Sequence, residues 1–329
     1  MLLPGCGGGK SGASSTPASK PLPPLAIRSL DLLTPLAGLR WLVVARPKEI
    51  ASTSWLEPSI AMLLDKGRLD QAAVSMGFDL RTVPEAIWAG YRADNNGLDD
   101  TSLQLVRHSN DSLEIERLFR DRLSSDVSRS IDDPRVVRVG GRIGRTVHAM
   151  ATIGVDIVCL QQDGSVDRGP CRVASLLALG KLKRTRSVFE DEAMRSLARR
   201  FGSAPLQLFA PGPFEGDLAR GVHGLLGAAT GIGMSFRPSV HESVLVEVVV
   251  TGDFTESGAE GSQRLMASWE DLAGRPLGHL LGLDAPIAQA MPMRMGEMVG
   301  ILVDLDARKL AKGLADATRN QIREIMVVR

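Results

Sequence analysis

Aromatic side chains are scarce in this sequence, and neither sign of charge is in excess. Only 8 Phe, 4 Trp and 1 Tyr occur in 329 residues, which leaves little material for stacking on bases or sugars. Lys and Arg number 39 against 38 Asp and Glu, so no overall field would attract nucleic acid. The composition therefore argues against a nucleic-acid partner, while its 44% of hydrophobic residues is typical of a globular chain.

Local motifs of covalent and metal chemistry are also missing. The sequence contains no G-x-S-x-G, S-x-x-K, C-x-x-C or H-E-x-x-H, and its 5 histidines never fall at metal-ligand spacing. A G-K-S sequence at residues 9–11 lacks the first glycine of a P-loop, because Pro4 holds that position. We therefore expect no bound cofactor and no catalysis based on a local motif.

No apolar run is long enough to cross a bilayer. The most apolar glycine-rich stretch, residues 221–236, contains His223 and is shorter than the roughly 20 residues that a spanning helix needs. Its glycines indicate close packing between a helix and a buried strand that follows it. We predict that helix at residues 214–226 and that strand at residues 231–237.

The most specific feature is at the N-terminus, where Leu3, Pro4, Gly5 and Cys6 follow one another. An aliphatic residue three positions before a cysteine, with a small residue directly before it, resembles the lipobox of bacterial lipoproteins. The resemblance implies that the signal peptide is removed, that Cys6 carries the lipid and that the protein resides in the cell envelope. Gly7, in place of an aspartate after the cysteine, then favours the outer membrane.

The residues on either side of this motif lead to two further expectations. Residues 7–24 are rich in Gly, Ser, Thr and Pro and cannot bury enough apolar surface to fold, so residues 1–24 should comprise the lipobox and a disordered tether. Only five residues precede Cys6, so the DNA upstream of Met1 should encode Lys or Arg followed by an apolar stretch. The alternative is a cytoplasmic protein with a frayed tail.

From residue 25 onward, helical and strand periodicities alternate. In a first half, residues 25–185, we predict strands at 41–46, 85–91, 102–107, 135–139, 145–151 and 155–161, and helices at 50–64, 69–76, 112–123 and 171–183. Asp111 or Ser112 should cap the helix at 112–123. In a second half, residues 186–329, we predict a connecting helix at 189–201, strands at 206–210, 231–237, 243–252, 287–293 and 298–305, and helices at 214–226, 258–272 and 307–325. The pattern indicates an α+β fold of two similar halves, each an antiparallel sheet with helices on one face.

Whether Cys159 and Cys171 form a disulfide depends on the compartment in which the protein resides. Cys159 ends an apolar strand and Cys171 begins the next helix, with two glycine-containing turns between them. In an exported protein the two residues are candidates for a disulfide, which would stabilise the fold by about 3 kcal/mol through loop entropy. In a cytoplasmic protein they would remain two reduced thiols.

A methionine cluster is the one candidate metal site. Met291, Met293 and Met295 alternate along a predicted strand and therefore share one face, with Met298 shortly after them. Thioethers are soft ligands that hold Cu(I) in compartments without thiols. The same alternation is typical of a core-facing strand, because methionine often fills gaps in cores. We favour the core interpretation and keep copper binding as an alternative.

Two classes of function follow from these observations. The first is a non-catalytic envelope lipoprotein with a binding or scaffolding role at the membrane face, where a peptide, a lipid or an envelope protein would lodge in a cleft between the halves. The second is a periplasmic hydrolase with a site assembled from distant residues such as Glu242, Asp304 and His279. Since every local motif is missing, we favour the first class.

Overall fold

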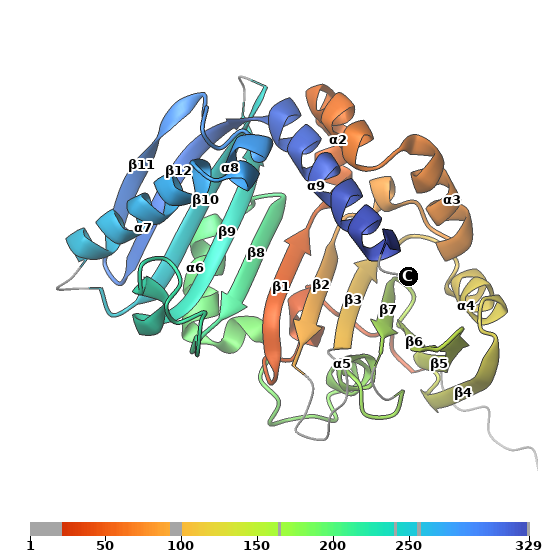
Figure 1. Ribbon diagram of the computed structural model, residues 1–329. Coiled ribbons are helices and arrows are strands. Elements are labelled where there is room, and N and C mark those ends of the chain that lie inside the picture. Colours follow the sequence, from red (N-terminus) through yellow and green to blue (C-terminus); the bar gives the residue numbers. More distant parts are fainter. Residues whose placement is uncertain (1–21, 93–100, 164–165, 240–241, 255–257, 328–329) are drawn as a thin grey trace, which may run out of the picture.

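The computed structural model describes residues 22–92, 101–163, 166–239, 242–254 and 258–327. Within these residues, 12 strands form one continuous sheet in the order β11-β12-β10-β9-β8-β1-β2-β3-β7-β6-β5-β4 (Figure 1). Every neighbouring pair is antiparallel. The strands are β1 (Leu39–Ala45), β2 (Ala86–Tyr91), β3 (Thr101–Arg107), β4 (Ser125–Asp133), β5 (Val136–Ile143), β6 (Thr146–Ile153), β7 (Ile157–Gln162), β8 (Leu206–Pro211), β9 (Ala229–Pro238), β10 (Ser243–Gly252), β11 (Ala288–Met295) and β12 (Met298–Asp306).

Both halves of the chain run outward from the central pair of strands, β1 and β8. In each half the first three strands follow one another across the sheet, as β1-β2-β3 and as β8-β9-β10. The last strand of each half then returns to pair with the third, β7 with β3 and β12 with β10. The first half carries an additional hairpin, β4 and β5, at its outer edge. The strand order is thus the same in both halves except for that hairpin.

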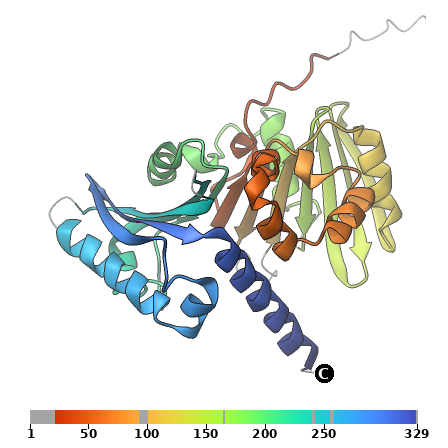
Figure 2. The ribbon, with the colours of Figure 1, turned by 90° about the horizontal axis from the view of Figure 1, so that it is seen from above.

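Helices cover both faces of the sheet, so the prediction of helices on one face is wrong (Figure 2). The reason is visible in β10, where Val248 and Val249 point to opposite faces and are 8% and 0% exposed. The back face carries α5 (Pro170–Ala178) and α6 (Glu192–Phe201). The front face carries α1 (Pro47–Ser52), α2 (Glu57–Leu63), α3 (Lys66–Met76), α4 (Ser112–Asp121), α7 (Gly258–Ala273), α8 (Pro276–Leu281) and α9 (Ala307–Val327). Short 3-10 helices are η1 (Leu30–Leu33), η2 (Ser54–Leu56), η3 (Leu80–Thr82), η4 (Val188–Glu190) and η5 (Leu225–Ala228).

The core of the back face is shared between the two halves. Leu42 of β1 lies in one apolar cluster with Phe201 of α6 and Val249 of β10. On the front face, α2 of the first half packs against α9 of the second. The expected boundary between residues 185 and 186 therefore separates two parts of the chain that bury one another's apolar surface.

Several local features differ from the sequence prediction. Residues 216–224 form turns rather than a helix, because Gly216 and Gly224 both have positive φ, of 60° and 80°. The edge strand β4 and the short helix α8 were not predicted at all. The helix predicted at residues 50–64 is divided into α1, η2 and α2, because Thr53 has extended backbone angles that end α1. The other predicted elements are found within a few residues of their expected ends, including α4 with Asp111 as its N-cap. No helix among the described residues has the length and apolar character to cross a membrane.

Candidate functional site

One continuous row of side chains crosses the front face of the sheet. The pairing registers place ten residues side by side on ten neighbouring strands. We call this set the front-face row; in sheet order it consists of Ile301, Val248, Met234, Leu208, Val43, Trp88, Gln104, Leu160, Met150 and Val139. Nine of the ten are apolar or aromatic, so the row forms an apolar band across the molecule.

The middle of the front-face row is open to solvent. Its ends are buried under helices, with Ile301 1% and Val139 0% exposed, whereas Trp88 is 51% exposed. Trp41 lies beside Trp88 with the ring centroids 5.8 Å apart and the planes at 75°, an edge-to-face pair. A Cβ on Gly90 would lie 2.3 Å from the Trp41 ring, so only glycine allows this ring to lie flat on β2. Exposed apolar surface of this kind is typical of binding sites.

At one end, the row leads into a cleft of about 600 Å³ beneath α7. The strands β9, β10 and β12 supply an apolar floor, and α7 supplies a wall through Leu265, Ser268, Trp269 and Leu272, whose spacing puts them on one side of the helix. The full lining is Arg220, Gly221, Val222, His223, Ile232, Met234, Val248, Leu265, Ser268, Trp269, Asp271, Leu272, Arg275 and Ile301. Its volume lies in the range of small-molecule sites.

The opposite wall of the cleft is a turn in a strained conformation. Val222 and His223 have φ values of 54° and 51°, in the left-handed region that non-glycine residues rarely adopt, and Gly224 follows at 80°. For a β-branched residue such as Val222 this conformation is an outlier. Backbone hydrogen bonds from Gly224 to the Arg220 carbonyl (3.1 Å) and from Leu225 to the Val222 carbonyl (3.0 Å) hold the turn. Strain of this kind is common at binding sites, and here it presents two side chains to the cleft.

Four ionisable side chains surround the mouth of the cleft, and we call them the polar rim: Arg220, His223, Asp271 and Arg275. His223 Nε2 lies 2.9 Å from the Asp271 carboxylate. Arg220 pairs at 2.7 Å with Asp217, but both side chains are largely exposed, so the pair is weak. Among the described residues, no carboxylate pairs with Arg275. The rim therefore holds two arginines against a single aspartate.

This site could not be predicted from the sequence because its residues do not form a local motif. They come from α7, three strands and a turn that we predicted to be a helix. All of them belong to the second half, so this cleft does not lie between the halves, where the sequence led us to expect a binding site. The one available signal was the spacing of Leu265, Trp269 and Leu272, which also fits an ordinary core-facing helix. Ser268, His223 and Asp271 line the same cleft, so a hydroxyl, an imidazole and a carboxylate are present together. Ser268 Oγ, however, donates to the Arg264 carbonyl at 2.8 Å rather than to the imidazole.

The predicted hydrolase residues are not brought together. Asp304 lies on the back face of β12, since its neighbours Val303 and Leu305 belong to the front core. His279 lies on α8 over the front face and pairs with Asp284 at 2.7 Å. Glu242 occupies a turn position with φ of 57° just before β10. No described hydrogen bond or ion pair joins any two of these three residues.

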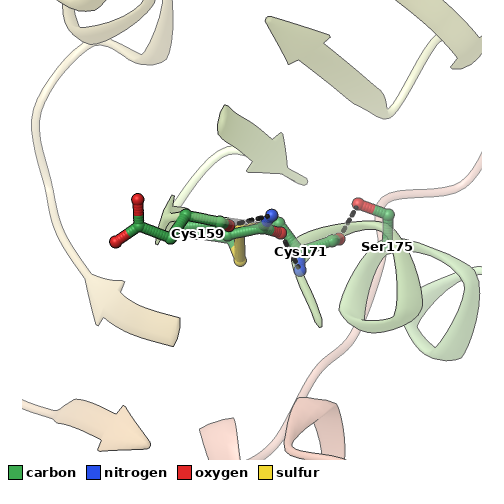
Figure 3. The surroundings of a disulfide bond; sticks show 5 residues. Cys159, Cys171 and Ser175 are labelled. Carbon is green, nitrogen blue, oxygen red and sulfur yellow. Dashed lines mark hydrogen bonds between the residues drawn. A yellow bond between two sulfur atoms is a disulfide. The ribbon is translucent and has the colours of Figure 1, made fainter. Parts of the chain in front are cut away.

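Cys159 and Cys171 are joined by a disulfide in the structure, with Cα atoms 5.8 Å apart (Figure 3). Both residues are buried in the back core, where the bond links β7 to the first turn of α5. The Cys171 amide donates to the Gln161 side chain at 3.2 Å, and Ser175 Oγ donates to the Cys171 carbonyl at 2.8 Å. The pair therefore serves as a structural link on the face opposite the cleft.

The methionine cluster lies on the back face of the edge hairpin. Met291, Met293 and Met295 stand opposite Leu302, Gly300 and Met298 in the register of β11 and β12. Met291 is 56% exposed, so the core interpretation is wrong for that residue. The Arg200 guanidinium lies 3.6 Å from the Met293 sulfur, which places a positive charge where a metal cation would bind.

Two further points bear on the predicted sites. Among the described residues, no group of three or more His, Cys, Asp or Glu side chains has the arrangement of a metal site. Cys6 and the rest of the lipobox lie outside the described residues.

Comparison of the chain with family models, with curated proteins and with solved structures gave no match.

Proposed function

We propose that the protein is a non-catalytic lipoprotein of the bacterial cell envelope, anchored through Cys6, whose folded body binds an apolar ligand on its front face. The observation that carries the binding role is the cleft of about 600 Å³ with an apolar floor, a polar rim and a strained wall. The open middle of the front-face row extends this apolar surface beyond the cleft. A role at the outer membrane is the favoured form of the proposal, because Gly7 follows the cysteine.

The position of the N-terminal segment fits this role. The described chain begins at Leu22 and runs along the back side of the sheet, away from α9 and the front-face helices (Figure 2). Arg135 donates to the Pro23 carbonyl at 3.2 Å and holds the segment there. An anchor attached before this segment would therefore leave the cleft free to receive its ligand.

The competing function is hydrolysis in the same cleft, because Ser268, His223 and Asp271 all line it. A nucleophilic serine needs its hydroxyl within hydrogen-bond reach of the base. Since Ser268 Oγ is bonded to the carbonyl of the preceding helical turn, we favour binding without turnover. Ester hydrolysis that is lost in both Ser268→Ala and His223→Gln would overturn the non-catalytic proposal.

We also propose that the two halves of the chain descend from one duplicated unit. The shared strand order, outward from β1 and β8, supports this origin. The pair β1 and β8 is antiparallel, as expected if a two-fold axis passes between them. Superposition of β1, β2, β3, β6 and β7 on β8, β9, β10, β11 and β12 checks the proposal, and a poor fit of the helices that connect them would count against it.

The binding role is tested with a neutral fluorescent probe such as N-phenyl-1-naphthylamine and the full chain carrying Cys6→Ser. The probe should bind, and Ser268→Phe should weaken binding strongly because the new ring enters the cleft from its α7 wall. Gln263→Phe is the matched control, since it adds the same ring to the exposed side of the same helix. Absence of probe binding to the parent chain would refute the proposal.

The anchor is tested separately, by expressing the gene with its upstream region in a bacterium supplied with a labelled fatty acid. Label should enter the parent chain and not the Cys6→Ser variant. An in-frame stop codon directly before Met1, or label that persists in Cys6→Ser, would refute the anchor without affecting the binding role.

A further inference from the structure

We infer that the ligand of the cleft is a single-chain amphiphile with an anionic head, of the class of long-chain carboxylates. The acyl chain would lie on the floor beneath α7, and the carboxylate would lie at the mouth beside Arg275 and Arg220. This inference rests on the proposed binding function and specifies the chemistry of the ligand.

The floor selects for a hydrocarbon chain. Ile232, Met234, Val248 and Ile301 present only carbon and sulfur atoms to the cleft from three adjacent strands. A polar group placed on them would lose its hydrogen bonds to water and gain none, which is costly. A methylene chain, in contrast, gains free energy from each group removed from water.

The shape of the apolar surface favours an extended chain. From Ile301 to Trp88 the front-face row crosses six strands, β12, β10, β9, β8, β1 and β2. With neighbouring strands about 4.8 Å apart, this distance is about 24 Å. The apolar surface is therefore long and continuous, and a chain that outgrows the cleft can extend from it onto the open middle of the row, which suits one long chain better than a compact ring system.

The rim selects for a negative head group. Arg275 is exposed at the junction of α7 and α8 and has no carboxylate partner among the described residues, so its guanidinium is available to a ligand. Arg220 lies on the turn across the mouth, and its exposed partner Asp217 is easily replaced. The single carboxylate of the rim, Asp271, is paired with His223 Nε2 at 2.9 Å, so two arginines stand against one aspartate around the mouth. Arginine binds carboxylates with two parallel hydrogen bonds, which gives such a site specificity for this head group.

The test uses the intrinsic fluorescence of Trp269, the one tryptophan in the cleft lining. The full chain carrying Cys6→Ser is titrated with a brominated long-chain fatty acid below its micelle concentration, because bromine quenches tryptophan at close range. Quenching should occur, should disappear in Trp269→Phe and should persist in Trp88→Phe. Over a series of saturated acids that compete with the probe, affinity should rise about fourfold per added methylene until the cleft is filled.

The head group is tested with a charge-removing variant and a neutral ligand. Arg275→Gln should weaken binding of the acid about tenfold and leave binding of the matching fatty alcohol unchanged. Arg264→Gln is the control, because Arg264 lies on the same helix outside the cleft lining and pairs with Glu260. Should Trp269→Phe fail to fold, loss of acid binding in Ser268→Phe gives the same information.

The possible results separate this inference from the proposed function. If acid and alcohol bind equally and Arg275→Gln changes neither, the anionic head is refuted while the neutral probe still supports a binding cleft. If quenching disappears in Trp88→Phe rather than in Trp269→Phe, the chain lies on the open middle of the row and the assigned site is wrong. If neither the acid nor the neutral probe binds, the inference and the proposed function both fail.

Discussion

His108 is a histidine that the fold keeps out of water. It is 5% exposed and stacks on the ring of Phe78, with the planes 16° apart. Its Nδ1 lies 3.1 Å from the Asn110 carbonyl. Burial lowers the pKa of His108 below its ordinary value of 6.5, and the Asn110 carbonyl and the charge of Asp156 only partly oppose this effect. The neutral imidazole is therefore the form that the folded chain prefers.

This preference predicts a pH dependence of stability. Below pH 6.5 the unfolded chain takes up a proton at residue 108 before the folded chain does, so the free energy of unfolding should decrease as pH is lowered from 7.5 to 5.5. His148 contributes with the same sign, because burial and then Arg122 lower its pKa. His108→Asn, which keeps a donor near the Asn110 carbonyl, should reduce this pH dependence. Urea titrations at pH 7.5 and 5.5 should then give free energies of unfolding that differ less than in the parent chain. An unchanged difference would show that residue 108 does not control the pH dependence.

At the scale of elements, α8 and α9 approach one another closely at a glycine. A Cβ added to Gly313 of α9 would lie 2.1 Å from the Leu280 carbonyl oxygen, which belongs to the backbone and cannot rotate away. Gly278 of α8 is similarly crowded, with its added Cβ 2.1 Å from the Leu272 carbonyl oxygen. Because α9 also packs on α2, this contact helps to join the two ends of the chain.

Gly313→Ala should therefore destabilise the protein by about 1 to 3 kcal/mol, although alanine favours helices by about 1 kcal/mol over glycine. Gly67→Ala in α3 is the matched control, because its new Cβ would meet only the Asp65 side chain, at 3.2 Å. The control should be neutral or slightly stabilising. Urea unfolding of both variants measures the difference, and equal stability would contradict the close approach of α8 and α9.

The link between β7 and α5 makes a second prediction at this scale. Replacing Cys159 and Cys171 together by alanine should lower the free energy of unfolding by about 3 kcal/mol, because the unfolded chain regains the freedom of a closed loop. A reducing agent should bring the parent chain close to the stability of the double variant. If reductant leaves the parent unchanged while the folded protein yields two free thiols, the bond contributes nothing to stability.

The elements with a strong local signal were predicted from the sequence. The hairpins of β2 with β3 and of β9 with β10 alternate around turn residues, and Asp111 precedes an amphipathic helix. The strand β4 was missed because its sequence is mostly polar, as expected of an edge strand with few buried positions. The prediction of a helix at residues 214–226 was wrong because it relied on the apolar spacing and gave no weight to Gly216 and Gly224, which adopt positive φ.

At the scale of the whole molecule, the candidate site was beyond the reach of sequence analysis. The front-face row can be recognised only once the strand order is known, because its members come from ten strands spread from Val43 to Ile301. The helices on both faces, in contrast, were foreseeable. Val248, Val249 and Val250 form an unbroken apolar run, which is typical of a strand buried on both sides.

The shared back core predicts that the halves do not fold alone. A fragment of residues 22–185 would expose Leu42 and the free edge of β1, both of which the second half covers. We expect this fragment to show no cooperative unfolding transition by circular dichroism and to regain one when it is coexpressed with residues 186–329. A cooperative transition in the isolated fragment would establish an independent domain.

The two outermost strands determine how such a broad sheet behaves among its neighbours. Unpaired backbone groups at a sheet edge invite another chain to continue the sheet, which is the first step of fibril growth. Here β11 contains Pro292, which has no N–H to offer, and β4 carries Asp126, Arg129 and Asp133, charges that resist burial against a second copy. A protein with these blunted edges can be crowded on a surface without polymerising edge to edge.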